Sequence, residues 1–331
     1  MQEFQIIDKY FKPLTINSKA ANGLLDDVAK ISLKKDEELI ISKDLFIEDV
    51  HFLKKDGGFK IASKLLRANL SDIASSGAKP IYYMLGFSKN KNLDKKFIEE
   101  FSLGLKSVQD EFDLCLIGGD TVSSEKLFFS ITIFGIAKKG KILSRIQAKN
   151  GDLIFTSGFI GDAYLGLKTA LSKKSLNKLN QDEKYLLERH FFPTARISLG
   201  QNLIKNNLSS CAIDVSDGLL SDLRHICRSS KLDADLYLDQ IPISDSAKKI
   251  LKNNDKINIL DLISGGDDYE LIFSANSKNR EKIFSLAKKL KINISEIGVF
   301  HKSLKKNFEI NLFKEKNNLS KIKIKKFGYE H

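Results

Sequence analysis

Strand-like runs of apolar residues alternate with helical repeats along most of this chain, and that alternation constrains its fold more than any other feature. Residues 38–42 and 45–53 are apolar, β-branched and partly alternating, which is typical of strands. Residues 60–76 instead carry apolar side chains at three- and four-residue spacing, and Gly77 follows where a helix cap belongs. Alternating strands and helices predict an α/β or α+β architecture.

The alternation continues through both halves of the chain. In the first half we expect strands at 81–87, 114–118 and 127–137 and a helix at 94–112. In the second half we expect strands at 152–156, 211–215, 234–238, 269–274 and 292–299 and helices at 161–171, 181–190, 195–206, 217–229 and 279–290. Residues 302–331 are rich in lysine and poorly periodic, and we assign no further element there.

The length and one turn signal together suggest two domains. A chain of 331 residues corresponds to about two domains of ordinary size. Asn150-Gly151 is a turn signal, and strands and helices occur in similar proportion on either side of it. We therefore expect two mixed α/β domains, residues 1–150 and 151–331.

The composition excludes several classes of protein. The chain carries 54 Lys and Arg residues against 42 Asp and Glu residues, a net charge of +12, and a basic surface attracts phosphate-bearing partners. The lysines are scattered, however, and the sequence has neither a basic stripe with interleaved aromatic residues nor a known nucleic-acid reader motif. We interpret the charge as a solvated surface and expect no nucleic-acid partner.

Cysteine usage and hydropathy indicate the compartment. Cys115, Cys211 and Cys227 are far apart and form no CxxC pair, which favours free thiols in a reducing environment. No apolar run approaches the roughly 18 residues of a membrane-spanning helix. The N-terminus lacks the basic-then-apolar order of a signal peptide. We expect a cytoplasmic protein that has no membrane partner.

Acidic residues, unlike lysines, are concentrated in clusters that adjoin apolar segments. The clusters are Asp26-Asp27, Asp44, Asp72, Asp120, Asp214 with Asp217, and Asp267-Asp268 with Glu270. Taken singly, each fits a solvated carboxylate or a helix cap. Taken together, they would repel one another without cations, and carboxylates are the hard oxygen ligands that suit Mg²⁺. The sequence has no zinc-type His/Cys spacing, no GxxxxGK[ST] and no GxGxxG, so we predict a phosphate-handling site built on metal ions.

Three of these clusters have a local physical reason to bind a ligand. Asp72 falls in the last turns of a predicted helix, where the helix dipole disfavours an anion and a divalent cation would reverse that penalty. Asp120 follows a buried-looking strand and two glycines, which let the backbone turn and approach a ligand at the strand's carboxyl end. Ser216 is placed to cap the helix expected at 217–229, which leaves Asp214 and Asp217 only partly explained as cap residues.

In this order the clusters resemble the motifs of the thiamine-monophosphate kinase family, which belongs to a superfamily with aminoimidazole ribonucleotide (AIR) synthetase and selenophosphate synthetase. The resemblance spans nearly the whole chain. Its motifs are Asp26-Asp27-Val28-Ala29, Ile41-Ser42-Lys43-Asp44 through His51-Phe52, Asn69 to Pro80, Gly118-Gly119-Asp120-Thr121, Leu143-Ser144-Arg145, Gly151-Asp152, Arg189-His190, Pro193 to Arg196, Ala212 to Leu219 and Ser264 to Leu271.

The resemblance implies two AIR synthetase-like α/β domains, a homodimer formed through the N-terminal one, and ATP-dependent phosphorylation of thiamine monophosphate to thiamine diphosphate with several Mg²⁺ ions. It implies metal ligands at Asp27, Ser42, Lys43, Asp44, Asp72, Asp120, Asp214 and Asp217. It implies ATP contacts at Gly119, Asp120, Arg145 and Ser216. It implies thiamine monophosphate contacts at His51 and Asp267, and an aromatic contact at Phe327 or Tyr329.

The mechanism that follows is direct in-line transfer. An acceptor phosphate is already ionised near neutral pH, so no strong general base is needed and no phosphoenzyme is expected. The sequence departs from the family pattern at three positions: Leu25 stands where the family has Gly, Lys43 where it has Thr, and Asp267 where it commonly has Glu. None of these departures removes a carboxylate.

Other functions remain open from the sequence. One is a different ATP-dependent enzyme of the same superfamily, although a selenophosphate synthetase would carry a reactive cysteine near the N-terminus and the first cysteine here is Cys115. Another is a non-catalytic nucleotide binder, which the departures at Lys43 and Asp267 leave open. A third is a basic nucleic-acid-binding protein, which lacks a supporting motif here.

Overall fold

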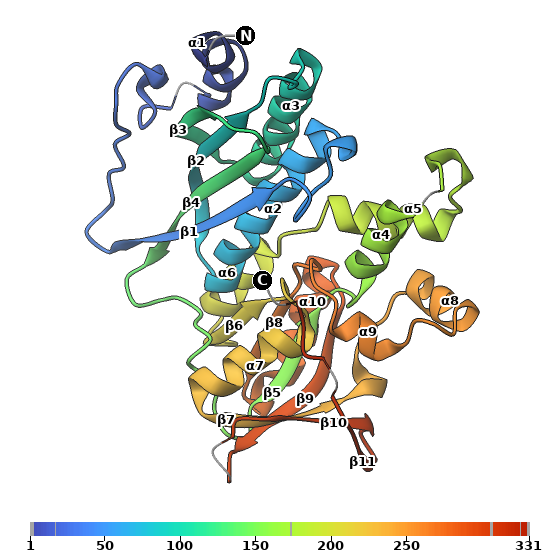
Figure 1. The fold of residues 1–331 in the computed structure, drawn as a ribbon. Helices are drawn as coiled ribbons and strands as arrows, with labels where there is room; N and C mark the ends of the chain where they lie inside the picture. Colours follow the sequence, from blue (N-terminus) through green and yellow to red (C-terminus); the bar gives the residue numbers. More distant parts are fainter. Residues whose placement is uncertain (1–2, 17, 173, 305–306, 325, 330–331) are drawn as a thin grey trace. The chain divides into compact units, whose positions relative to one another are not determined.

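The computed structural model describes residues 3–16, 18–172, 174–304, 307–324 and 326–329 (Figure 1). The chain forms two compact units. The first comprises Met1–Ile73 and Ala78–Lys141, and the second comprises Ala74–Gly77 and Ile142–His331. Each unit has its own sheet, with helices packed against it.

The first unit is built on a four-stranded sheet of order β1-β4-β2-β3. Its strands are β1 (Glu37–Ile47), β2 (Lys79–Lys89), β3 (Cys115–Ser123) and β4 (Phe128–Lys138). β2 and β3 run parallel, and the other pairs are antiparallel. Its helices are α1 (Glu3–Ile6), α2 (Gly58–Ser76) and α3 (Lys95–Phe112), and short helical turns follow α1.

The helix α3 is specified by its N-terminal cap and by its apolar stripe. At the start of α3, Asp94 accepts the Phe97 N–H at 2.7 Å, which satisfies one of the free donors of the first turn. The apolar face of α3 carries Phe101, whose ring centre lies 5.3 Å from that of Phe87 on β2 and 4.6 Å from that of Phe129 on β4. This aromatic cluster joins α3 to the middle of the sheet.

The second unit is built on a seven-stranded sheet of order β11-β10-β7-β9-β5-β8-β6, in which only the β10–β7 pair is parallel. Its strands are β5 (Leu153–Ser157), β6 (Cys211–Asp214), β7 (Leu232–Tyr237), β8 (Leu271–Ala275), β9 (Ile294–Lys302), β10 (Ile310–Glu315) and β11 (Asn318–Ile322). Its helices are α4 (Asp162–Leu171), α5 (Gln181–Phe191), α6 (Ile197–Lys205), α7 (Leu219–Ser230), α8 (Asp245–Asn253), α9 (Ile259–Ile263) and α10 (Arg280–Leu290).

The predicted fold class of two mixed α/β domains is confirmed, and most predicted elements are present. The expected strand at 45–53 is wrong beyond Ile47, because the chain turns there: Asp49 has φ 68°, and the His51 N–H bonds back to the Ile47 carbonyl at 2.9 Å. The strand expected at 114–118 continues to Ser123. The sequence-based prediction also missed α1, α8, α9, β10 and β11.

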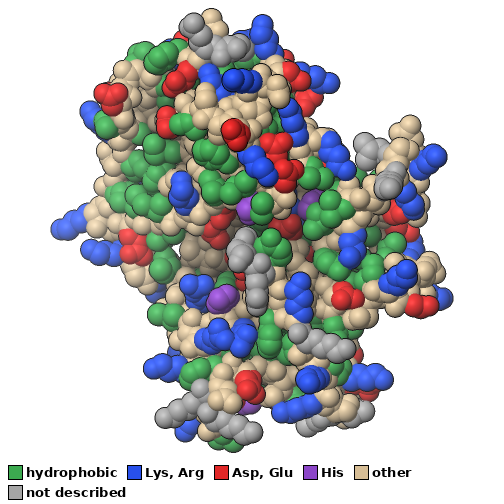
Figure 2. All heavy atoms as spheres, viewed as in Figure 1, with side chains coloured by type: hydrophobic (Ala, Val, Ile, Leu, Met, Phe, Trp, Pro, Cys, Tyr) green, Lys and Arg blue, Asp and Glu red, His purple; other side chains and the backbone are tan. Residues whose placement is uncertain are grey.

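Two surface properties follow from the structure. Figure 2 shows the Lys and Arg side chains of this face dispersed among acidic and apolar ones, which agrees with a solvated rather than a concentrated charge. In the part of the chain that the structure describes, the helices do not combine the length and the apolar character that a membrane crossing requires.

Candidate functional site

In the first unit, β1 and α2 bring three of the predicted metal ligands together. Ser42 and Asp44 lie two residues apart on β1, so their side chains point to the same face of the sheet. The Ser42 hydroxyl donates a hydrogen bond to the Asp72 carboxylate on α2. The Asp44 N–H donates to the Asn69 side-chain oxygen, also on α2, at 3.2 Å. Local geometry thus gathers two carboxylates and a hydroxyl in a half-buried position.

The electrostatics of this pair favour a bound cation. Burial, and then the negative charge of Asp72, raises the pKa of Asp44 from 3.8 to about 7. Burial also raises the pKa of Asp72, although the hydrogen bond from Ser42 opposes that change. Two half-buried carboxylates repel each other when both are ionised, and a divalent cation converts that cost into attraction. A donor set made only of hard oxygen atoms suits Mg²⁺.

Lys43 lies between the two ligands on β1 but on the opposite face. Its ammonium group donates to the Ser130 hydroxyl on β4 at 3.3 Å. The alternation of a strand therefore directs this positive charge away from Ser42 and Asp44. Lys43 could bind a metal ion only through its backbone carbonyl oxygen.

A cavity of about 210 Å³ in the first unit holds the other predicted ligands of this unit. Asp27, Gly119 and Asp120 line it, together with Asp26, Gly118, Thr121 and residues of the N-terminal helix. The sequence predicted that Asp120 would follow the strand in a turn. In the structure it lies within β3. Gly119 is required by packing, because a Cβ at this position would lie 2.0 Å from the Leu85 carbonyl oxygen of β2.

His51 is held by the turn that ends β1. Its Nδ1 accepts the Ile47 N–H at 3.2 Å, and its ring stacks on Phe46 with a centroid distance of 5.3 Å. An imidazole whose Nδ1 accepts a hydrogen bond carries its proton on Nε2 when neutral. The structure thus gives His51 a local structural role in addition to its expected role as a substrate contact.

In the second unit, Asp214, Ser216 and Asp217 lie where β6 ends and α7 begins. Asp214 is the last residue of β6, and the two others belong to the following loop. The expected cap by Ser216 is wrong, because Gly218 occupies the cap position. The loop donors are satisfied instead by Asp222, which accepts N–H groups from Ser216 at 3.0 Å, Asp217 at 3.1 Å and Gly218 at 3.2 Å. Sequence reasoning missed Asp222, although an acid in the first turn of a helix is a known signal.

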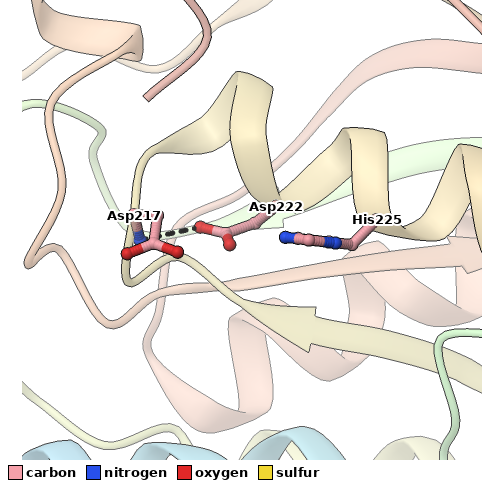
Figure 3. A group of neighbouring side chains, drawn as sticks. All are labelled: Asp217, Asp222 and His225. Atoms are coloured by element: carbon pink, nitrogen blue, oxygen red, sulfur yellow. Dashed lines mark hydrogen bonds between the residues drawn. The ribbon is translucent and has the colours of Figure 1, made fainter. Parts of the chain in front are cut away.

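Asp217, Asp222 and His225 form a group that could hold a metal ion (Figure 3). One donor atom from each of the three lies within 4.8 Å of the others. Burial, and then the charge of Asp217, raises the pKa of Asp222 to about 7. Burial, and then Arg145, lowers the pKa of His225, so its imidazole is neutral near pH 7 and has a lone pair available. Arg145, the predicted ATP contact, is therefore close enough to act on this group.

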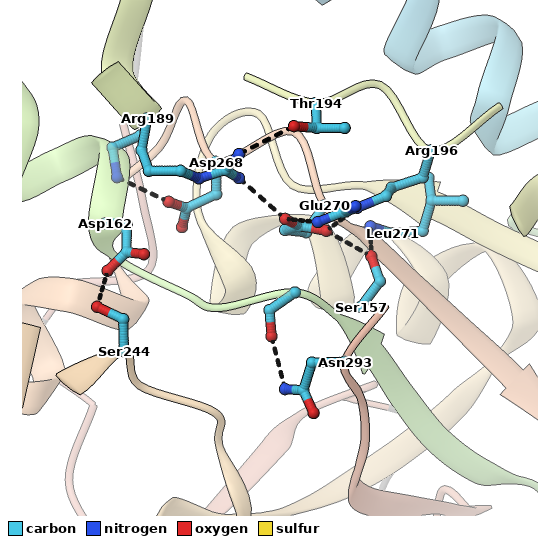
Figure 4. Close-up of polar contacts among 12 residues, drawn as sticks. Ser157, Asp162, Arg189, Thr194, Arg196, Ser244, Asp268, Glu270, Leu271 and Asn293 are labelled. Carbon is cyan, nitrogen blue, oxygen red and sulfur yellow. Dashed lines mark hydrogen bonds and ion pairs between the residues drawn. The ribbon is translucent and has the colours of Figure 1, made fainter. Parts of the chain in front are cut away.

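The acids of the Ser264–Leu271 segment have different environments (Figure 4). Glu270 is completely buried and accepts hydrogen bonds from Arg196 Nε and Nη2 at 2.6 Å each, Arg189 Nη2 at 3.0 Å and Ser157 Oγ at 2.6 Å. Asp268 is also buried and accepts the Gly161 N–H at 2.7 Å and the Ala163 N–H at 3.0 Å, at the start of α4. Both carboxylates therefore have structural roles.

Asp267 is the accessible acid of the same segment. Its side chain is 33% exposed, and its Oδ2 lies 3.8 Å from Nδ1 of His190. Its backbone has φ 70°, and its N–H donates to the Ser216 carbonyl at 2.8 Å. The Tyr269 hydroxyl donates to its Oδ1 at 3.3 Å. This backbone geometry directs Asp267 away from the buried network that fixes its two acidic neighbours.

The two candidate aromatic contacts near the C-terminus lie near the loop of Asp217 and the helix α7 that follows it. The Tyr329 N–H donates to the Asp217 carbonyl at 2.9 Å, and the Tyr329 side chain is 50% exposed. The guanidinium of Arg224 lies 4.3 Å from the ring centre of Phe327. Phe327 also packs against the hydrophobic core of the second unit, whereas Tyr329 is the more exposed of the two candidates.

Comparison with known proteins matches the two halves of the chain to the two domains of one family. Residues 25–137 match the N-terminal domain of AIR synthase related proteins, and residues 149–310 match their C-terminal domain. The thiamine-monophosphate kinase of Buchnera aphidicola subsp. Schizaphis graminum is 39% identical to this chain over 332 residues, which cover 99% of this chain and 98% of the relative.

Two solved structures are similar over nearly their whole length. The crystal structure of thiamine-monophosphate kinase from Stenotrophomonas maltophilia K279a is 33% identical, with a TM-score of 0.83 over 95% of this chain and 98% of that one. The structure of AaThiL complexed with AMPPCP and TMP is 25% identical, with a TM-score of 0.77 over 99% of this chain and 97% of that one.

Proposed function

This chain belongs to the thiamine-monophosphate kinase family, and we propose that it transfers the terminal phosphoryl group of ATP to thiamine monophosphate, giving thiamine diphosphate and ADP. One observation carries the proposal: a thiamine-monophosphate kinase is 39% identical over 98% of its own length. The AaThiL complex, which contains AMPPCP and TMP, supports the same pair of substrates.

We propose that Mg²⁺ ions are held by carboxylates of both units. In the first unit the proposed ligands are Asp27, Ser42, Asp44, Asp72, Asp120 and the Lys43 carbonyl oxygen, and in the second unit they are Asp214 and Asp217. The hydroxyl and carboxylate cluster of Ser42, Asp44 and Asp72 supports this assignment, because it consists of hard oxygen donors and gains stability from a cation. When bound, Mg²⁺ would neutralise the charge on phosphate oxygens that must approach each other.

The remaining expected contacts divide between the nucleotide and the acceptor. We propose that Gly119, Asp120, Arg145 and Ser216 contact ATP. Thiamine monophosphate would be bound by His51 and Asp267, with Phe327 or Tyr329 against its ring. The acceptor phosphate is ionised near neutral pH, so the chain has to align two phosphates and does not have to remove a proton. We therefore propose direct in-line transfer without a phosphoenzyme.

We further propose that the protein acts in the cytoplasm as a homodimer formed by the first unit. β1 is an edge strand of its sheet, and two apolar side chains on it, Ile41 and Leu45, are 56% and 43% exposed. Exposed apolar residues on one face of an edge strand are typical of an interface. Cys115, Cys211 and Cys227 are buried and unpaired, which suits a reducing compartment.

An acceptor panel tests the proposed reaction. Purified protein with Mg²⁺ and ATP would be offered thiamine monophosphate, thiamine or a substrate of AIR synthetase in separate reactions. We expect ADP to form with thiamine monophosphate alone. Turnover of another acceptor in preference to thiamine monophosphate would instead identify a different enzyme of the same superfamily.

A further inference from the structure

One side chain accepts hydrogen bonds from three of the N–H groups in the loop of residues 215–218. A single oxygen of Asp222, Oδ2, accepts hydrogen bonds from Ser216, Asp217 and Gly218 at 3.0, 3.1 and 3.2 Å. Asp222 is only 2% exposed, so solvent does not replace it as an acceptor. Hydrogen bonds to a carboxylate are stronger than those to a neutral acceptor.

The carbonyl groups of the same loop hold two other segments of the second unit. The carbonyls of Val215 and Ser216 accept the N–H groups of Tyr269 and Asp267, both at 2.8 Å, and the Asp217 carbonyl accepts the Tyr329 N–H at 2.9 Å. The loop therefore connects the proposed metal and ATP residues, the proposed acceptor contact Asp267 and the C-terminal aromatic segment. A displacement of the loop would move all three.

The loop has a restricted conformation and close neighbours. Gly218 has φ 123°, a region that L side chains rarely adopt, and a Cβ on Gly266 would lie 2.2 Å from the Ser216 carbonyl oxygen. The loop is thus packed closely against the Ser264–Leu271 segment. Removing the acceptor would leave three neighbouring N–H groups without it, and the loss is costly at Gly218, whose hydrogen bond is buried.

We propose that Asp222 is a positioning residue for phosphoryl transfer: it holds the loop of residues 215–218 so that Ser216, Asp217 and Asp267 are presented in one fixed arrangement. This inference rests on the proposed function, because the roles of those three residues come from it. Asp222 also belongs to the group with Asp217 and His225 that could hold a metal ion, but its Oδ2 accepts three backbone N–H groups, and the proposal concerns this effect on the loop.

Two substitutions at one position test the proposal. Asp222→Ala removes the acceptor, and Asp222→Asn keeps an oxygen of similar position without the charge. We expect Asp222→Ala to raise the Mg²⁺ concentration for half-maximal activity, and the Kd for AMPPCP in the presence of Mg²⁺, by about 10- to 100-fold, as outer contacts of metal sites commonly do. For Asp222→Asn, both the Mg²⁺ concentration for half-maximal activity and the Kd for AMPPCP should lie between those of Asp222→Ala and those of the unmodified protein. If Asp222→Ala does not fold, the Asn variant decides alone.

Asp152 offers a matched control. It is also buried, at 7% exposure, and its Oδ2 accepts the Lys149 N–H and the Ser274 hydroxyl, both at 3.0 Å, within a turn that has no proposed ligand. Asp152→Asn should lower the melting temperature and leave the Mg²⁺ requirement within about 2-fold of the unmodified value. A folded Asp222 variant that behaves like this control, with lower stability but an unchanged Mg²⁺ requirement and AMPPCP affinity, would overturn the proposal.

The two readouts separate this inference from the proposed function. Binding of AMPPCP with Mg²⁺ does not need thiamine monophosphate. If the unmodified protein binds AMPPCP but phosphorylates no thiamine monophosphate, the proposed reaction is wrong, and the binding data still decide the role of Asp222.

Discussion

Arg196 donates two parallel hydrogen bonds of 2.6 Å to the completely buried Glu270, from Nε to Oε2 and from Nη2 to Oε1. Arg189 adds a third bond to the same carboxylate at 3.0 Å. A buried carboxylate is tolerated when its charge and its lone pairs are satisfied in this way. These hydrogen bonds from Arg196 and Arg189 to Glu270 connect the start of α6 and the end of α5 to the start of β8.

Glu270→Gln should therefore destabilise the protein. The neutral amide would leave two arginines without a counter-charge in a buried position, and breaking such a pair costs about 3–5 kcal/mol. Urea unfolding followed by circular dichroism measures the change. Asp245→Asn, which removes an exposed partner of Lys248, is the control and should leave the unfolding midpoint unchanged. Equal midpoints for the two variants would contradict the role given to Glu270.

Replacing Asp44 should have opposite effects on stability and on activity. Asp44→Asn removes one charge from a half-buried like-charged pair, so the metal-free protein at pH 8 should become more stable. The same change removes a proposed Mg²⁺ ligand and should lower turnover by at least about 100-fold. Unfolding in EDTA and turnover with Mg²⁺ measure the two effects. Asp110→Asn, on the exposed face of α3, is the control. A metal-free Asp44→Asn protein that is less stable than the unmodified one would argue against a repelling pair.

The cysteines should be unreactive while the protein is folded. Cys211 and Cys227 have no exposed surface, and burial raises the pKa of each thiol to about 12. Burial also raises the pKa of Cys115. Because a raised pKa keeps the thiol protonated, labelling by a disulfide reagent at pH 8 should be at least about 100-fold slower than in urea. Rapid labelling of Cys211 or Cys227 in the native protein would contradict the packing of the second unit.

Gly119 and Gly118 should respond differently to alanine. A Cβ at Gly119 would lie 2.0 Å from the Leu85 backbone oxygen, whereas a Cβ at Gly118 would lie 3.1 Å from the flexible end of Met84. Gly119→Ala should destabilise the protein by about 3 kcal/mol, because β2 and β3 must separate. Gly118→Ala should lower the free energy of unfolding much less, because the end of Met84 can move. Thermal unfolding compares them, and equal losses would show that the β2–β3 spacing does not depend on Gly119.

Elements with a strong local pattern could be predicted from the sequence, and elements that depend on distant partners could not. α2 was predictable because its apolar residues repeat on one face and Gly77 ends it with φ 74°. β10 has a lysine-rich neighbourhood that hides its pattern. It becomes a strand because it pairs with β7, which buries Leu312 and Phe313. That pairing is a tertiary contact and leaves no local signal.

The candidate site also has features that the sequence predicts and features that depend on distant partners. A cluster of acids in the sequence indicates a metal site, and the structure joins Ser42, Asp44 and Asp72 across a separation of 30 residues between Ser42 and Asp72. The sequence does not separate Asp267, which is accessible, from Glu270, which is buried against two arginines. The difference arises from backbone geometry and from the partners of each carboxylate, and a run of adjacent acids contains neither.

The transfer of a phosphoryl group from ATP to thiamine monophosphate can be tested by the product ratio of one reaction. Protein, Mg²⁺, ATP and thiamine monophosphate would be followed by ³¹P nuclear magnetic resonance, with EDTA added to a parallel sample. We expect ADP and thiamine diphosphate to form in equal amounts and EDTA to stop both. Formation of ADP and inorganic phosphate without thiamine diphosphate would contradict this expectation, because the bound nucleotide would then transfer its phosphoryl group to water and not to thiamine monophosphate.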